Sequence, residues 1–123
     1  MREAINATFT AVARDEPAER HWPALRVYAA AALQRSVLTA DHRLEWPEGA
    51  DPRAMLWPVA HATAGLLTGP ELHRVKRCAG CPWLFMDRSE NGSRRWCAMN
   101  DCGTHEKITR YVARRAADRT APT

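Results

Sequence analysis

All four cysteines of this chain lie in one stretch, at positions 78, 81, 97 and 102. Two residues separate the first pair, fifteen separate the pairs, and four separate the last two. Two close pairs joined by such an arm are typical of the ligands of one metal ion. Zinc accepts four thiolates at tetrahedral corners, each sulfur about 2.3 Å from the ion. The spacing therefore predicts a zinc site whose ligands are Cys78, Cys81, Cys97 and Cys102. We expect Gly80 to adopt a positive φ where the backbone curls between the first two.

Three other uses of these cysteines remain open. Two disulfides are typical of small secreted domains, but residues 1–4 lack the apolar core of a secretion signal. A redox CxxC pair needs a βαβ context, which is not readable here. Four unrelated buried cysteines would not be expected to cluster within 25 positions. The spacing favours zinc, and the missing signal favours a cytoplasmic protein whose thiols stay reduced.

The distribution of charge divides the chain into two parts. Residues 1–73 carry 7 Arg and 9 Asp or Glu, a net charge of −2, whereas residues 74–123 carry 11 Arg or Lys and 5 Asp or Glu, a net charge of +6. Four thiolates around Zn²⁺ would lower the second figure by about two. The basic part suits an anionic partner, and a solvated basic surface is the alternative. No apolar run approaches the roughly 20 residues that cross a bilayer, so no membrane partner is expected.

Residues 1–73 are expected to form a helical domain with one hairpin. The spacing of apolar residues predicts helices over 2–13, 18–34 and roughly 52–67. Short strands over 37–39 and 43–46 would pair as the hairpin. Asp51 is expected to cap the third helix, with Pro52 at its first position, and Pro58 either bends this helix or marks its first turn. The stripe expected to face the core is Met55, Val59, Ala62 and Leu66.

Residues 74–119 are expected to form a treble-clef-like zinc module of knuckle, hairpin and helix. A strand over 82–87, a tight turn at Asn91-Gly92 and a returning arm over 94–96 would make the hairpin. A helix would then run from Cys102 to about Arg119, with residues 120–123 as a disordered tail. The fold class is therefore mainly α with small β elements.

The segment from Arg77 to Gly103 resembles the CGNR zinc finger. The resemblance rests on the cysteine spacing, the strand Trp83-Leu84-Phe85-Met86-Asp87, the turn Arg94-Arg95-Trp96-Cys97, and a basic helix after Cys102-Gly103. In that family the finger ends a bacterial protein whose front half is an ABATE domain, and residues 1–73 are similar to the later part of one. The resemblance implies a structural zinc, contact with DNA and a role in stress-induced transcription regulation. The name-giving Asn-Arg pair is replaced here by Thr104-His105.

The last expected helix supplies the case for nucleic acid. At about 100° per residue, Lys107, Arg110 and Arg114 share one face. Ile108, Tyr111, Val112 and Ala116 occupy a face that is expected to pack inward. With Arg94 and Arg95 at the hairpin, these cations predict binding to double-stranded DNA, and five phosphate contacts would give a salt slope of about −4.5. RNA is less favoured because Trp83 and Trp96 are expected to be buried beside the zinc.

Two functions remain open at this point. The first is a DNA-binding transcription regulator whose helical half forms a homodimer or senses a small molecule. The second is a zinc-stabilised protein–protein interaction module without nucleic-acid binding. An apolar pocket lined by Trp46, Met55 and Trp57 would suit either. No enzyme is expected, since the sequence has no HExxH helix, glycine-rich phosphate loop or Gly-x-Ser-x-Gly elbow. Four thiolates also leave no open position on zinc.

Overall fold

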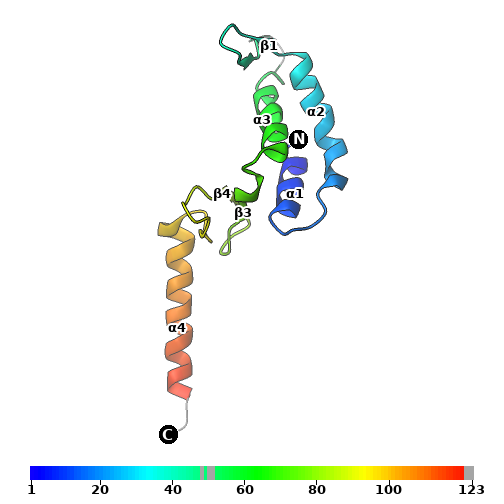
Figure 1. Ribbon diagram of the computed structural model, residues 1–123. Coiled ribbons are helices and arrows are strands. Elements are labelled where there is room, and N and C mark those ends of the chain that lie inside the picture. Colours follow the sequence, from blue (N-terminus) through cyan, green and yellow to red (C-terminus); the bar gives the residue numbers. More distant parts are fainter. Residues whose placement is uncertain (48, 50–51, 121–123) are drawn as a thin grey trace. The chain divides into compact units, whose positions relative to one another are not determined.

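The computed structural model describes residues 1–47, 49 and 52–120, and it divides the chain into two compact units. The first unit is Met1–His73 and the second is Arg74–Thr123. Helices dominate both units, and each contains one small antiparallel hairpin (Figure 1). The expected fold class, mainly α with small β elements, is therefore confirmed. No helix in the described ranges combines the length and the apolar character that crossing a bilayer requires.

Three helices build the first unit. Helix α1 is Arg2–Val12, α2 is Trp22–Gln34 after the 3₁₀ turn η1 (Glu19–His21), and α3 is Leu56–Thr68. Pro23 lies in the first turn of α2, where its missing N–H costs nothing. The third helix begins later than expected because Pro58 also lies in its first turn, and residues 52–55 form turns before it. The expected cap Asp51 lies outside the described residues.

Helices α2 and α3 pack against each other (Figure 1). Small side chains allow this close packing. Ala32 on α2 is completely buried, and it forms a core cluster with Trp57 and Ala60 on α3. Tyr28 and Trp46 pack against this cluster with part of their surface exposed. Alanines favour both helix formation and close approach of two helix axes, which explains why this short alanine-rich sequence can enclose a core.

The face of α3 that enters the core differs from the expected one. Met55 is 74% exposed and Val59 is 47% exposed, whereas the buried residues of the helix are Trp57, Ala60 and Thr63. Trp57 decides this orientation because it has the largest apolar surface to bury. The hydroxyl of Thr63 enters the core at no cost since it donates to the carbonyl oxygen of Val59 at 2.7 Å. Trp57 is thus a core residue and Met55 is exposed, so the two do not share the apolar pocket that we expected with Trp46.

The expected hairpin of the first unit is present. Strand β1 (Val37–Leu38) pairs antiparallel with β2 (Leu44–Glu45). Directly after β2, the indole N–H of Trp46 donates to the carbonyl oxygen of Ala32 at 2.7 Å. This bond satisfies a half-buried donor and attaches the hairpin to α2.

The second unit begins with a hairpin and ends with a helix. After the 3₁₀ turn η2 (Leu72–Arg74), strand β3 (Val75–Arg77) pairs antiparallel with β4 (Leu84–Met86). A π-helical turn, η3 (Met99–Gly103), then leads into α4 (Thr104–Thr120). Of the expected tail over 120–123, residues 121–123 lie outside the described residues.

The pairing of β4 corrects the expected hairpin. Residues 82–87 were expected to pair with residues 94–96, but β4 pairs with β3, which precedes the knuckle. The segment 94–96 instead donates and accepts single hydrogen bonds: the N–H of Arg94 binds the Asp87 carboxylate at 2.9 Å, and the carbonyl oxygen of Arg95 accepts the N–H of Ala79 at 2.9 Å. The expected turn at Asn91-Gly92 is confirmed, since Gly92 has a φ of 56° and its N–H binds Ser89.

Candidate metal centre

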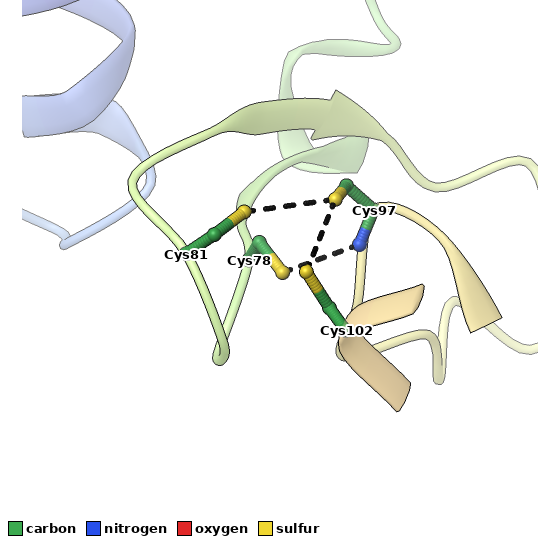
Figure 2. Close-up of side chains that lie close together, drawn as sticks. All are labelled: Cys78, Cys81, Cys97 and Cys102. Atoms are coloured by element: carbon green, nitrogen blue, oxygen red, sulfur yellow. Dashed lines mark hydrogen bonds between the residues drawn. The ribbon is translucent and has the colours of Figure 1, made fainter. Parts of the chain in front are cut away.

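Three separate segments of the second unit bring the four cysteines together. Cys78 and Cys81 lie in the loop between β3 and β4, Cys97 lies just before η3, and Cys102 lies within η3. Figure 2 shows the four side chains pointing toward one another. All four sulfur atoms lie within 4.8 Å of one another. The Sγ of Cys97 is 3.7 Å from that of Cys81 and 3.8 Å from that of Cys102.

These separations fit a tetrahedral zinc ion. Four sulfurs at about 2.3 Å from a common centre are about 3.8 Å apart along each edge of the tetrahedron. A disulfide would require about 2.05 Å, and the four cysteines are free. The donor set is four soft sulfurs, enough to fill the four positions of a tetrahedral ion, which is the composition of a structural zinc site. Such an ion would clamp three segments of the chain.

Backbone N–H groups donate hydrogen bonds to the sulfur of Cys78. Its side chain is buried, and its Sγ accepts the backbone N–H groups of Cys97 at 3.3 Å and of Gly80 at 3.4 Å. Burial raises the pKa of this thiol, but the hydrogen bonds that favour its charged form outweigh burial and bring the pKa to about 6. Cys78 is therefore a thiolate at neutral pH, the form that binds a metal.

The pKa values of the Cys97 and Cys102 thiols are shifted in the opposite direction, upward. Burial raises the pKa of Cys97, and hydrogen bonding to Cys81 together with burial raises the pKa of Cys102. Four negative charges at these distances repel one another unless a cation is present. Zinc would supply that cation and displace the remaining protons, which links metal binding to folding.

Gly80 serves the centre in a different way from the one expected. Its φ is not positive, and Gly92 is the glycine with a positive φ among the described residues. A Cβ atom at Gly80 would lie 3.2 Å from the Cβ of Cys102 and 3.7 Å from the ring of Trp96. The glycine is therefore needed because the knuckle approaches the turn that carries Cys102.

Asp87 holds the rest of the module together, and the sequence interpretation did not single it out. Its side chain is completely buried and accepts the ammonium of Lys76 at 2.8 Å, the backbone N–H and hydroxyl of Ser89 at 3.0 and 2.6 Å, and the backbone N–H of Arg94 at 2.9 Å. The ion pair with Lys76 and the bonds from Ser89 keep the pKa of this carboxyl well below its ordinary value. The carboxylate thus joins β3, β4 and the segment that delivers Cys97.

A signal for this network was present in the sequence. The chain has 18 basic residues, and all but Lys76 and Lys107 are arginines. Lys76 uses its compact ammonium to bind both Asp87 and the carbonyl oxygen of Gly92. A lysine at this position, followed by an Asp-x-Ser turn, is the pattern that could have revealed the buried ion pair.

The five cations expected to contact nucleic acid lie in two different environments. Arg94 is engaged within the module, since its guanidinium donates to the carbonyl oxygens of Trp96 and Cys97 and lies 5.4 Å from the ring centre of Phe85. Arg95 lies over the ring of Trp96 and is exposed. On α4, Lys107, Arg110 and Arg114 are all exposed, and Arg110 pairs with Glu106 at 3.1 Å. Their contact with nucleic acid stays a prediction.

Two expectations about apolar residues in this unit are wrong. Trp83 was expected to be buried beside the zinc, but it is 70% exposed, whereas Trp96 is half-buried against Gly80 and Gly103. The apolar face of α4 was expected to pack inward, but Ile108, Tyr111 and Val112 are more than half exposed. Helix α4 meets the module through η3 at its first turn, so its later turns have no surface beneath them within the described part of this unit.

Comparison with known proteins finds one family model that covers this centre. Residues 74–115 match the family model of the CGNR zinc finger. No curated protein and no solved structure matches the chain. The match contains all four cysteines, and their sulfurs have the geometry of a tetrahedral site. Residues 74–115 are therefore similar to the CGNR zinc finger, and the four cysteines among them are positioned to hold a structural Zn²⁺.

Proposed function

We propose that this protein is a DNA-binding transcription regulator whose zinc finger presents α4 to double-stranded DNA. The observation that carries the proposal is the exposure of α4: Lys107, Arg110 and Arg114 share one face, and every described side chain from Lys107 onward is exposed. A helix of this length and charge fits the major groove or lies along a phosphate backbone. Zinc would hold Cys102 in η3, which leads directly into the helix, and would so set the direction of the helix relative to the rest of the finger.

The number of available cations sets the expected salt dependence. Arg94 is bound to two backbone carbonyl oxygens, so four of the five expected cations remain free to contact phosphate: Arg95, Lys107, Arg110 and Arg114. The ion pair of Arg110 with Glu106 is exposed and weak, and a phosphate can replace the carboxylate. Four contacts give a slope of log affinity against log salt of about −3.6.

The exposed apolar face of α4 favours a second candidate, a protein–protein interaction module. Ile108, Tyr111 and Val112 form a continuous apolar stripe on the helix, which could pack against a partner protein with a complementary acidic rim. In this case zinc has the same structural role, and nucleic acid is not bound. Both candidates assign the chain no catalytic activity. A homodimer or a small-molecule ligand in the first unit is compatible with both.

Titration of labelled duplex DNA with the zinc-loaded protein at two salt concentrations separates the candidates. The double variant Arg110→Ala and Arg114→Ala is expected to reduce the salt slope by about 1.8 and to weaken binding at low salt. The matched control is Arg26→Ala with Arg43→Ala, which removes the same charge from exposed positions of the first unit. Equal loss in both double variants indicates non-specific attraction, and no binding at low salt favours the protein-interaction module.

A further inference from the structure

An uncharged apolar stripe runs along the outer side of α3. It consists of Met55, Val59, Ala62 and Leu66, the residues whose periodicity predicts a core face. Met55 is 74% exposed and Val59 is 47% exposed, while Ala62 is exposed and Leu66 is half-buried. Met55 precedes the helix with a helical backbone conformation, so at about 100° per residue all four side chains lie within about 60° around the axis. They form one surface, which we call the α3 stripe.

This surface is unusual for the outer side of a helix. The opposite side of α3 already carries the core residues Trp57, Ala60 and Thr63. From Leu56 to Thr68 the helix has no Asp, Glu, Lys or Arg on any side. Helices at the surface of soluble proteins usually place charged or polar side chains away from the core, and helices that are apolar all round are usually buried. A second protein surface is therefore expected to cover the α3 stripe.

We propose that a second copy of this chain covers the α3 stripe, with the two α3 helices antiparallel. The four residues follow one another at intervals of four, three and four positions, a series that is the same in both directions along the helix. About a two-fold axis at the midpoint of the stripe, Met55 faces Leu66 of the second copy, and Val59 faces Ala62 of the second copy. The central contact thus places a branched side chain opposite a small one, which lets the two helices approach closely.

The absence of charge favours a second copy over a polyanion or an acidic protein. In a two-fold interface the same surface meets itself, so a charged stripe would bring like charges together. The α3 stripe avoids this repulsion because none of its residues is charged. For the same reason it offers no electrostatic attraction to an anionic partner, whereas the cations of α4 do. The inference goes beyond the proposed function and holds whether or not the chain binds DNA.

The size of the stripe indicates how strong the dimer is. A helix of 13 residues is about 20 Å long and about 10 Å wide with its side chains. A contact of this size is smaller than the roughly 800 Å² per partner that stable interfaces bury. We therefore expect a dimer that dissociates on dilution.

Sedimentation of the full zinc-loaded chain over a range of protein concentrations at high salt tests the inference. High salt screens contacts between exposed charges and weakens any bridging by nucleic acid, but it leaves an apolar contact in place. The mass is expected to rise from 13.8 kDa toward twice that value as the concentration increases. A mass that stays at 13.8 kDa at every concentration overturns the inference.

Two variants test which helix faces meet. Val59→Lys and Ala62→Glu each place a charge opposite an apolar side chain of the other copy. Each variant alone is expected to dimerise about tenfold more weakly or worse, because the charge loses water without gaining a partner. An equimolar mixture is expected to recover much of the loss, since the ammonium at position 59 then faces the carboxylate at position 62 of the other copy. Single variants that dimerise like the wild type, or a mixture that recovers nothing, overturn the antiparallel pairing.

The matched control is Ile108→Lys, which places the same charge on a 57% exposed apolar residue of α4 in the second unit. It is expected to leave dimerisation unchanged. Loss of dimerisation in Ile108→Lys but not in Val59→Lys would assign the contact to α4 and overturn the inference. Circular dichroism checks that the variants keep their helices. If Val59→Lys does not, Ala62→Glu alone carries the test, because Ala62 is exposed and glutamate favours helices.

Discussion

The ammonium of Lys76 lies 2.8 Å from the carboxylate of Asp87, and the carboxylate is completely buried while the lysine is about one-third exposed. The pair connects β3 with the residue after β4, and Asp87 also receives the backbone N–H of Arg94, three residues before the ligand Cys97. The Asp87 carboxylate therefore connects the strand that leads to Cys78 with the segment that leads to Cys97.

The first prediction concerns this network. Asp87→Asn removes the negative charge that accepts hydrogen bonds from Lys76, Ser89 and Arg94. It also leaves the half-buried ammonium of Lys76 without its ion-pair partner. We expect a clearly lower midpoint of thermal unfolding for the zinc-loaded second unit and weaker zinc binding. The matched control is Glu90→Gln at an exposed position of the same turn region, which is expected to change neither. Equal midpoints for Asp87→Asn and the wild type would contradict the assigned role.

The second prediction is a pH dependence with a defined sign. Lys76 and Ser89 hold the pKa of Asp87 below its unfolded-state value of about 3.9. The ionised carboxylate therefore stabilises the folded state fully at pH values above about 4, and the stabilisation is lost as the pH falls below that value. We expect the difference in unfolding free energy between the wild type and Asp87→Asn to stay constant from pH 7 to pH 5 and to narrow in more acidic solution. The carboxyl carbon signal of Asp87 in nuclear magnetic resonance should remain that of an ionised group down to the pH at which zinc is lost.

The third prediction compares alanine substitutions at Gly65, within α3, and at Gly69, directly after its last residue. A Cβ at Gly65 would meet nothing within 4 Å, so Gly65→Ala should stabilise the first unit by about 0.5–1 kcal/mol through helix propensity. A Cβ at Gly69 would lie 2.6 Å from the backbone oxygen of Gly65, so Gly69→Ala should destabilise the unit by about 1–3 kcal/mol. Chemical denaturation of both variants checks the sign of each change. Stabilisation by both would show that α3 does not end as described.

The fourth prediction concerns the exposed turns of α4. Helices of this length that pack on nothing are only marginally stable in water. We expect the backbone amides from Lys107 onward to exchange their hydrogens much faster than those of α2 and α3 in the free protein. Duplex DNA should slow exchange in α4 under the proposed function. Strong protection in the free monomeric protein would contradict the exposure of Ile108 and Tyr111.

Particular residues show how far the sequence could predict this structure. The cysteine spacing was sufficient to predict which sulfurs meet, because few chain paths can bring two close pairs to one ion. Local signals also placed the helices, the first hairpin and the turn at Gly92, since each depends on residues that are neighbours in sequence.

Long-range choices could not be predicted in the same way. Strand β4 could pair with either of two segments, and neither the pairing with β3 nor the buried ion pair of Lys76 with Asp87 beside it can be read from local sequence. The exposure of Trp83 and of the apolar face of α4 could not be predicted because periodicity shows which residues share a face and not whether another element covers it. The prediction of which face of α3 enters the core was wrong for a related reason. Trp57 has more apolar surface to bury than any residue of the predicted stripe, and periodicity does not take this into account.

The central claim is that one zinc ion, held by four thiolates, organises the second unit. Metal binding in such modules supplies about 10–16 kcal/mol of folding free energy, so chelation should unfold the segment 74–115 and leave the helices of the first unit. X-ray absorption at the zinc edge of the purified protein tests the claim most directly. We predict one zinc per chain with four sulfur neighbours at about 2.3 Å. Absence of zinc, or a shell containing nitrogen or oxygen in place of one of the sulfurs, would contradict the account.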